Sequence, residues 1–313
     1  SVKKATQTDI AISSFKTTYI FDLDGSVFKA EFVSPLPLDD PMRVSEPVCY
    51  LSYELTGKAK IAEVSLFVNR RIAYTSDDRL PKNDACRNYS YNLGEDQVAF
   101  VGLKRQLYLS NNEDWSGADW GYWYVCGEKA AALDGYDFAQ YLATGEKDFS
   151  NAGEEKYIAA FGYGKDGFIT LAYDSIVDAI SDVRKNRKQI EEHLDAIDRE
   201  LKKKAESISE DYYRILVASL RQSVAAHTII KDNDGKLLFL SKENGSNGCI
   251  GTLDVSYPSM PLYLLYNTEF VKGMLRPIVK FARMPVWNFD FAPHDVGTYP
   301  HCAGNVYGAE KNG

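Results

Sequence analysis

The fold of this chain turns on residues 176–201, which read IVDAISDVRKNRKQIEEHLDAIDREL. Apolar residues recur there at spacings of three, four and seven, namely Ile176, Ile180, Val183, Ile190, Leu194, Ile197 and Leu201. This stripe predicts one long amphipathic helix. Because the other face is charged, we expect the helix to tie two domains together. A coiled coil is the alternative, but the stripe lasts only about four heptads and skips a position near Arg187.

The residues before this helix form short runs rich in Thr, Tyr, Phe and Val, separated by turn residues. Residues 17–21 and 27–33 predict a hairpin with one wetted face, and residues 48–55 and 61–68 predict a second pair. Many short strands at this spacing favour an antiparallel β-sandwich over residues 1–173.

A second helix is predicted after the long one. Residues 207–210 fit a capping box, with Ser207 as the cap and Glu210 three positions on. The helix is expected to reach about Ile230, and His227 continues its apolar stripe, where a packed core residue is more common than a catalytic one. Residues 233–235 then predict a turn, and residues 237–240 a short strand.

Length and composition limit the classes of protein. The chain has 313 residues, which favours two domains, and no apolar run approaches the roughly 20 residues of a membrane span. The net charge of −8, with mixed charges in the basic runs, argues against a nucleic-acid partner. The five widely spaced cysteines argue against a zinc finger and against a disulfide-dense scaffold.

Two polar segments follow apolar elements and contain the candidate catalytic and substrate-binding residues. The first spans residues 241–261; its glycines let the backbone approach a ligand closely. Its candidates are Glu243, Asn244, Asn247, Asp254 and Tyr257. An ornate structural loop is the alternative.

The second segment spans residues 287–300, with Trp287, His294, Asp295 and Tyr299 as candidates. Adjacent side chains point in different directions in a regular backbone, so His294 and Asp295 need not pair with each other. A loop with buried hydrogen bonds is again the alternative. We expect the two segments to face one shared cleft.

Several motifs together resemble the glutaminase A family. The stronger set lies after residue 210: Asp211-Tyr212-Tyr213, Arg221-Gln222-Ser223, residues 239–244, Ser246-Asn247-Gly248, Tyr257-Pro258-Ser259, residues 274–277, residues 291–300 and Asn305-Val306-Tyr307-Gly308. A moderate set lies before it: Thr17-Thr18-Tyr19, residues 32–35, residues 45–50 and Asp119-Trp120-Gly121-Tyr122.

The resemblance implies a β-sandwich followed by an (α/α)6 toroid. Twelve helices need well over about 200 residues, at the mean helix length plus connections. We therefore expect a β-sandwich at residues 1–173, a linker helix at 174–208 and only the first part of a toroid at 209–313, so that the chain is a truncated piece of the full domain.

The resemblance also implies a hydrolase that converts glutamine to glutamate and ammonia. Glu243, Asp254 and Asp295 are the candidate catalytic acids and bases, because water attack on an amide needs a base and then an acid. Asn244, Asn247, Tyr257, Trp287, His294 and Tyr299 are the candidate substrate-binding residues. No cofactor is implied, and a metal is left undecided.

Two other functions stay open. The toroid fold commonly places two carboxylates across a cleft, so a glycoside hydrolase in carbohydrate metabolism is the first alternative. The second is a non-catalytic fragment that acts as a binding or assembly module. In the enzymatic cases the substrate is a small molecule, either glutamine or a glycan.

Two further expectations concern partners and location. A partial toroid would leave apolar helix faces bare, notably those of Leu216, Leu220, Val224, Val271, Met274, Leu275 and Ile278. The remainder of the toroid or a second copy is therefore expected to cover them. An extracytoplasmic location, periplasmic, cell-surface or secreted, follows from the family resemblance.

Overall fold

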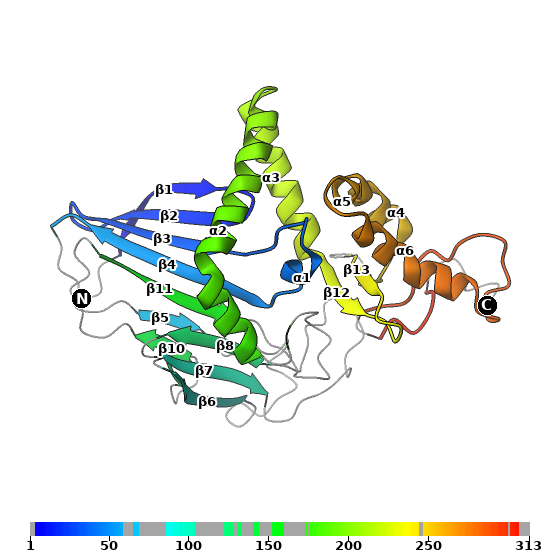
Figure 1. Ribbon diagram of the computed structural model, residues 1–313, viewed down its shortest axis with the longest axis horizontal. Helices are drawn as coiled ribbons and strands as arrows, with labels where there is room; N and C mark the ends of the chain where they lie inside the picture. Colours follow the sequence, from blue (N-terminus) through cyan, green and yellow to red (C-terminus); the bar gives the residue numbers. More distant parts are fainter. Residues whose placement is uncertain are drawn as a thin grey trace.

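The computed structural model describes residues 4–58, 65–68, 86–94, 96–103, 122–127, 130–132, 140–143, 152–159, 173, 176–243, 247–299 and 301–306. An antiparallel sheet occupies one side of the molecule and helices cover and extend it (Figure 1). In spatial order the large sheet contains β1 (Thr6–Ile12), β2 (Lys16–Asp22), β3 (Val27–Val33), β4 (Val48–Thr56), β11 (Ala152–Ala159), β8 (Tyr122–Gly127), β7 (Asp96–Leu103) and β6 (Cys86–Leu93).

A second sheet contains β5 (Ser65–Val68), β10 (Gln140–Ala143) and β9 (Ala130–Ala132). The predicted hairpin of β2 and β3 is confirmed, with Phe21 opposite Phe28. The predicted pairing of β4 with β5 is wrong. Both edges of β4 are occupied, by β3 and by β11, so β5 pairs with β10 instead. Leu66 of β5 packs against the apolar side chains of β4, which brings the two sheets into contact.

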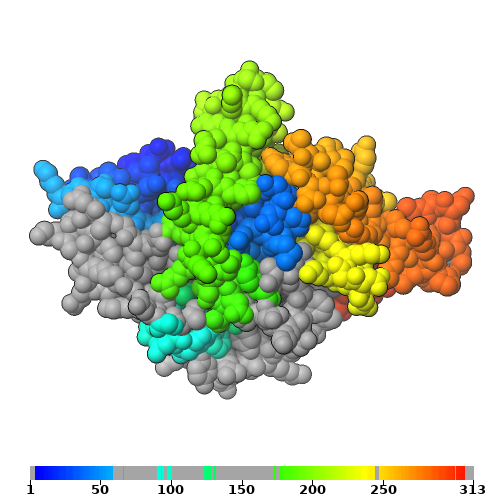
Figure 2. All heavy atoms as spheres, viewed as in Figure 1, coloured from blue at the N-terminus to red at the C-terminus, as the bar shows by residue number. Residues whose placement is uncertain are grey.

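The long helix α2 (Ile176–Glu206) is confirmed over the predicted stripe. It crosses the large sheet and lies between that sheet and the C-terminal helices (Figures 1 and 2). Its buried residues Val183 and Leu194 belong to the same apolar cluster as Val33 and Tyr50 of the sheet. Burial of one face therefore holds the helix in place, as its amphipathic pattern predicted.

A cluster of charged groups, here called the polar joint, fixes α2 to the short helix α1 (Pro41–Val44). It consists of Arg43, Glu46, Tyr173 and Asp182. Arg43 donates to Glu46 Oε2 (2.6 Å) and to Asp182 Oδ2 (2.9 Å). The Tyr173 hydroxyl donates to Asp182 (2.7 Å), and the Glu46 side chain is fully buried. Burial raises the pKa of Glu46 to about 7, against the opposing effect of its Arg43 and Tyr173 partners.

The helix α3 (Glu210–Ala225) differs from its prediction at both ends. Ser209 is its cap, accepting from the Tyr212 N–H, whereas Ser207 donates to Lys204. The helix stops at Ala225 because the next residues form β12 (His227–Lys231), which pairs with β13 (Leu237–Ser241). The β-branched run after His227 favours a strand once a partner is present.

The C-terminal unit is completed by α4 (Leu253–Ser256), η3 (Tyr257–Ser259), α5 (Met260–Tyr266) and α6 (Thr268–Ala282). Four rings in mutual contact form its interior, here called the ring cluster: His227, Phe239, Tyr263 and Phe270. The His227 and Phe239 rings are nearly parallel, with centroids 4.3 Å apart. His227 is therefore a packed core residue, as predicted.

The helix α6 approaches β13 closely at Gly273. A Cβ atom there would lie 2.6 Å from a side-chain carbon of Leu237 and 2.9 Å from the backbone nitrogen of Phe239. Only glycine fits this contact. The glycine therefore fixes the distance between the helix and the small sheet that carries the candidate site.

The predicted bare helix faces are mostly covered within the chain itself. Leu220, Val224, Met274 and Ile278 are buried by α2, by β12 and β13 and by the loops, and only Leu275 of the seven residues is exposed. Apolar residues elsewhere are exposed, namely Ile208, Ile215, Leu264, Leu265, Val279, Met284 and Val286.

The mixed β and α architecture with antiparallel sheets is thus confirmed. The toroid and the boundaries at residues 173/174 and 208/209 stay predictions. Among the described residues, no helix combines the length and the apolarity that crossing a bilayer requires.

Candidate functional site

The first half of the candidate site is the loop after β13. The Glu243 N–H donates to the Cys249 carbonyl (2.8 Å), and the Gly248 N–H donates back to the Glu243 carbonyl (3.2 Å). Gly248 has a φ of 68°, which favours glycine. The Asn247 side-chain oxygen accepts from the Cys249 N–H (2.9 Å), so it is engaged within the loop. Asn244 lies outside the described residues.

The second half of the site runs alongside this loop. The Ile250 N–H donates to the Gly297 carbonyl (2.9 Å), and the Ile250 carbonyl accepts from Val296 (3.0 Å). The Tyr299 N–H donates to the Gly248 carbonyl (2.9 Å). The two predicted segments therefore lie side by side, and the substrate cleft expected between them stays a prediction.

The Asp295 carboxylate is completely buried and surrounded by donors. Its Oδ1 accepts from the backbone N–H groups of Gly297 (2.9 Å) and Val306 (3.0 Å). Its Oδ2 accepts from Asn305 Nδ2 (3.3 Å) and lies 3.0 Å from His294 Nδ1. An oxygen pair that only accepts is the ionised form of the acid. Asp295 is thus a fixed negative charge beside the imidazole.

His294 joins this buried carboxylate to an exposed one. Its Nε2 lies 3.5 Å from Oδ1 of Asp254, on the first turn of α4. The exposed fraction of the side chain is 38% for His294 and 77% for Asp254. With Nδ1–H donating to Asp295, the neutral ring presents Nε2 as an acceptor on the solvent side. Asp254, His294 and Asp295, here called the carboxylate–imidazole chain, therefore run from solvent to the interior.

The pairing of His294 with Asp295 corrects the sequence argument that these neighbours need not meet. That argument assumes a regular backbone. Here the Asp295 side chain folds along its own chain to the Gly297 N–H, and Gly297 has a φ of 111°. The tight turn lets both side chains reach the same side.

The third predicted acid, Glu243, sits beside the chain of Asp254 and His294. The Thr252 hydroxyl donates to its Oε2 (3.1 Å), and the side chain is half-buried. The Leu253 N–H, next to Thr252, donates to the His294 carbonyl (3.1 Å). Residues 252 and 253 thus link Glu243 to His294, through one side-chain and one backbone hydrogen bond.

The remaining predicted residues lie around these groups. Tyr257 is highly exposed on η3. Trp287 is buried, and its Nε1 donates to the Phe291 carbonyl (2.7 Å). The Tyr299 ring lies under the Lys242 ammonium, 4.9 Å from the ring centroid, and burial raises the pKa of its hydroxyl. The substrate-binding roles of all these residues stay predictions.

Sequence reasoning missed two groups that complete the site. Thr252 supports Glu243, and Asn305 supports Asp295. Asn305 lies in one of the motifs that resemble the glutaminase A family, which was the available signal. Thr252 has no such signal, because a single threonine in a polar loop belongs to no motif.

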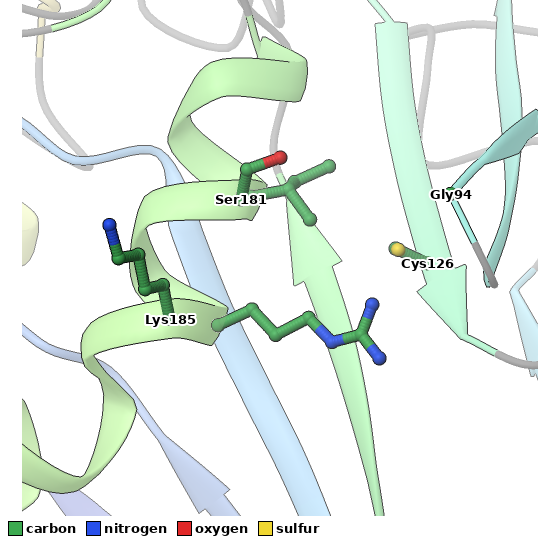
Figure 3. Close-up of a pocket in the computed structure, with 6 residues that line it drawn as sticks. Gly94, Cys126, Ser181 and Lys185 are labelled. Atoms are coloured by element: carbon green, nitrogen blue, oxygen red, sulfur yellow. The ribbon is translucent and has the colours of Figure 1, made fainter.

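Other candidate sites on the described residues are weaker. A cavity of about 480 Å³ lies between α2 and the sheet, and its lining includes Cys126, Ser181 and Lys185, but no predicted site residue. The Lys185 side chain points away from Cys126 (Figure 3). Within the described part of the chain, no group of three or more His, Cys, Asp or Glu side chains is arranged to hold a metal ion.

Comparison with known families assigns both parts of the chain. Residues 209–312 match the glutaminase A six helical-hairpin domain, and residues 15–161 match a domain of unknown function, DUF5127. The predicted resemblance to the glutaminase A family is thus confirmed. The candidate site lies entirely within the six helical-hairpin match.

Two curated proteins are similar to this chain. "Glutaminase A" of Aspergillus oryzae is 24% identical over 97% of this chain and 51% of its own length. "Probable glutaminase" of Arthroderma benhamiae is 31% identical over 34% of this chain and 12% of its own length. The chain therefore spans about half the length of the Aspergillus protein and a smaller share of the other.

Proposed function

We propose that this chain is part of a hydrolase that releases ammonia from the side-chain amide of glutamine. The observation that carries the proposal is the carboxylate–imidazole chain of Asp254, His294 and Asp295. The names of the two similar proteins supply the substrate.

In the proposed reaction, His294 acts first as the general base and then as the general acid. The oxygen of a water molecule bonds to the amide carbon while one water proton passes to Nε2 of His294. The C–N bond then breaks as the imidazolium returns that proton to the nitrogen. The products are glutamate and ammonia, and no cofactor is required by this scheme.

Asp295 takes a different role from the one expected of it. Because its oxygens are buried and engaged by donors, it does not reach substrate. It acts as a positioning residue that holds the Nδ1–H tautomer of His294 and stabilises the imidazolium after proton transfer.

The two more accessible carboxylates are left for the substrate. Asp254, beside Nε2, is placed to accept a hydrogen bond from the amide nitrogen as it becomes the leaving group. Glu243, held by Thr252, is placed to bind the substrate's ammonium group. Both assignments rest on charge complementarity between carboxylates and N–H donors.

A glycoside hydrolase is the second candidate. Exposed rings favour it, since Tyr257 and Phe291 are 73% and 53% exposed near the two loops, and sugar faces stack on such rings. In this case Glu243 and Asp254 would supply the two carboxylates that the reaction needs.

The test uses the whole protein that carries this sequence. It is incubated with glutamine and with a glycan panel, and both ammonia and reducing ends are measured. His294→Gln should lower the ammonia rate about 10²- to 10⁴-fold, the usual size of general acid–base catalysis. His193→Gln is the matched control, because His193 lies on α2 and pairs with Asp39.

Each outcome decides between the candidates. Full activity of His294→Gln would show that the imidazole is not the base. Release of reducing ends without ammonia would favour the glycosidase. Neither product from the wild-type protein would favour a binding or assembly module.

We also propose that α3, α5 and α6 are part of a six-hairpin toroid. Exposed apolar residues on α5 and α6, including Leu264, Leu265 and Val279, would pack against its other helices, supplied by the rest of a longer protein or by a second copy. The predicted extracytoplasmic location stays a proposal.

A further inference from the structure

Asn305 has an unusual hydrogen-bonding balance. Its Nδ2 donates to the Asp295 backbone carbonyl (3.4 Å) and to the Asp295 carboxylate (3.3 Å). Its own side-chain oxygen is buried and accepts no hydrogen bond among the described residues. All of its recorded side-chain hydrogen bonds therefore go to a single residue of the candidate site.

A buried acceptor without a partner destabilises a protein. A leucine has nearly the shape of an asparagine and would avoid that penalty. Asn305 therefore combines a stabilising donation to the buried Asp295 with the penalty of an unpaired acceptor, which makes its net contribution to stability small. Its placement is explained if the hydrogen bonds to Asp295 serve another purpose.

The purpose suggested by the geometry is control of the imidazole. The Oδ2 atom of Asp295 faces both Asn305 Nδ2 and His294 Nδ1, while Oδ1 is fixed by two backbone N–H groups. Asn305 thus restricts rotation of the carboxylate group about its bond to the rest of the side chain. A fixed Oδ2 keeps the proton of His294 on Nδ1, so that Nε2 is the acceptor nitrogen of the ring.

We propose that Asn305 is a positioning residue that sets the tautomer and the orientation of His294 through the Asp295 carboxylate. Its catalytic consequence rests on the proposed function, whereas its effect on the tautomer does not. The segment of residues 301–306, which also supplies the Val306 N–H, is in this view part of the active site.

The experiment separates a positioning role from a structural one. Imidazole ¹⁵N shifts report which ring nitrogen carries the proton at a pH where the ring is neutral. The chain has only four histidines, so the His294 signals are assigned by their loss in His294→Gln. We compare the wild-type protein with Asn305→Leu and with Asn305→Ser, which folds more readily if leucine is too apolar.

In the wild-type protein we expect His294 as the Nδ1–H tautomer. In both variants we expect a mixture of tautomers and a turnover number lowered about tenfold or more, the lower end of the effect of losing such a supporting contact. The melting temperature should change little in Asn305→Leu, because loss of the two hydrogen bonds to Asp295 is offset by removal of the unpaired acceptor. Asn233→Leu, at an exposed asparagine between β12 and β13 and outside both polar segments, should change neither the tautomer nor the turnover number.

Two results would overturn the proposal. One is an unchanged His294 tautomer in both variants. The other is a marked loss of stability in Asn305→Leu with no change of tautomer in Asn305→Ser, which would make Asn305 structural. A shifted tautomer in a protein without glutaminase activity would support the positioning role and reject the proposed reaction.

Discussion

The polar joint and the ring cluster each hold a helix in place, but with opposite kinds of interaction. The polar joint uses Arg43 between two carboxylates, with one of them, Glu46, fully buried. The ring cluster uses stacked aromatic side chains and one histidine that has lost its charge. Burial lowers the pKa of His227 to about 4.

The difference shows two uses of a buried polar group. In the polar joint the Arg43 charge is kept, and it contacts Glu46 close by in the sequence and Asp182 far from it. In the ring cluster the imidazole is neutral and contributes mainly through packing. The candidate site combines both devices, since a buried charge on Asp295 holds an imidazole whose other side faces solvent.

The largest effect is expected from Arg43→Met in the polar joint. Removing the cation takes away the group that lowers the pKa of Glu46, so the buried carboxyl must take up a proton or stay charged without its partner. Losing one partner of a buried pair typically costs up to about 3–5 kcal/mol, and uptake of a proton reduces that loss. Urea denaturation at neutral pH measures this loss. The double variant with Glu46→Leu should recover much of it, because no charge then remains buried.

Lys188→Met is the control for charge alone, since Lys188 is highly exposed on α2, the helix that carries Asp182. It should leave the free energy of unfolding unchanged. Equal losses of unfolding free energy in Arg43→Met and Lys188→Met would mean that the polar joint stabilises the protein no more than an exposed charge does. The contrast between the polar joint and the ring cluster would then be wrong.

The next effect is a pH dependence that belongs to the ring cluster. The folded pKa of His227 is about 4, below the ordinary value of 6.5, so the unfolded chain binds the proton more tightly. The contribution to stability is therefore full above pH 6.5 and is lost as the pH falls towards 4. It amounts to about 3 kcal/mol at roughly 1.4 kcal/mol per pKa unit.

His227→Phe tests this, because a phenyl ring can keep the stack on Phe239. Unfolding free energies measured between pH 4 and pH 7 should show a smaller slope than in the wild-type protein. His193→Phe, at an exposed histidine, should retain the wild-type slope. An unchanged slope in His227→Phe would show that His227 is not the group responsible.

The smallest effect is expected where a hydrogen bond lies between the ring cluster and the site. The hydroxyl oxygens of Ser241 and Ser256 are 2.6 Å apart and buried. Ser256→Ala leaves the Ser241 hydroxyl without this partner and should cost about 1 kcal/mol. The double variant Ser241→Ala/Ser256→Ala should be nearly neutral, and a much larger loss in it would indicate a packing role instead.

Part of the site could be predicted from the sequence. The two polar segments and the glycines within them marked the loops that the structure brings together. The contact between His294 and Asp295 could not be predicted, because it depends on the geometry of a turn at Gly297 that no local pattern predicts. The support from Asn305 depends in the same way on where the last described segment folds back.

The sequence by itself determined the long helix and several of the strands, among them β2, β3, β4 and β13. An amphipathic stripe or an alternating run indicates which of its side chains will be buried, because the pattern is formed by residues close together in the sequence. The sequence could not determine that β5 pairs with β10 instead of β4, or that His227 begins a strand. Those outcomes depend on which edge or partner is free.

Only the tertiary structure decided the chemistry of the candidate site. The sequence marks His294, Asp254 and Asp295 as candidates, but the roles proposed for them follow from burial and from donors supplied by Gly297, Asn305 and Val306. The physical reason is that the electrostatic environment of a group is set by atoms in space. Sequence patterns report local periodicity, whereas a buried carboxylate acquires its partners only when the chain has folded.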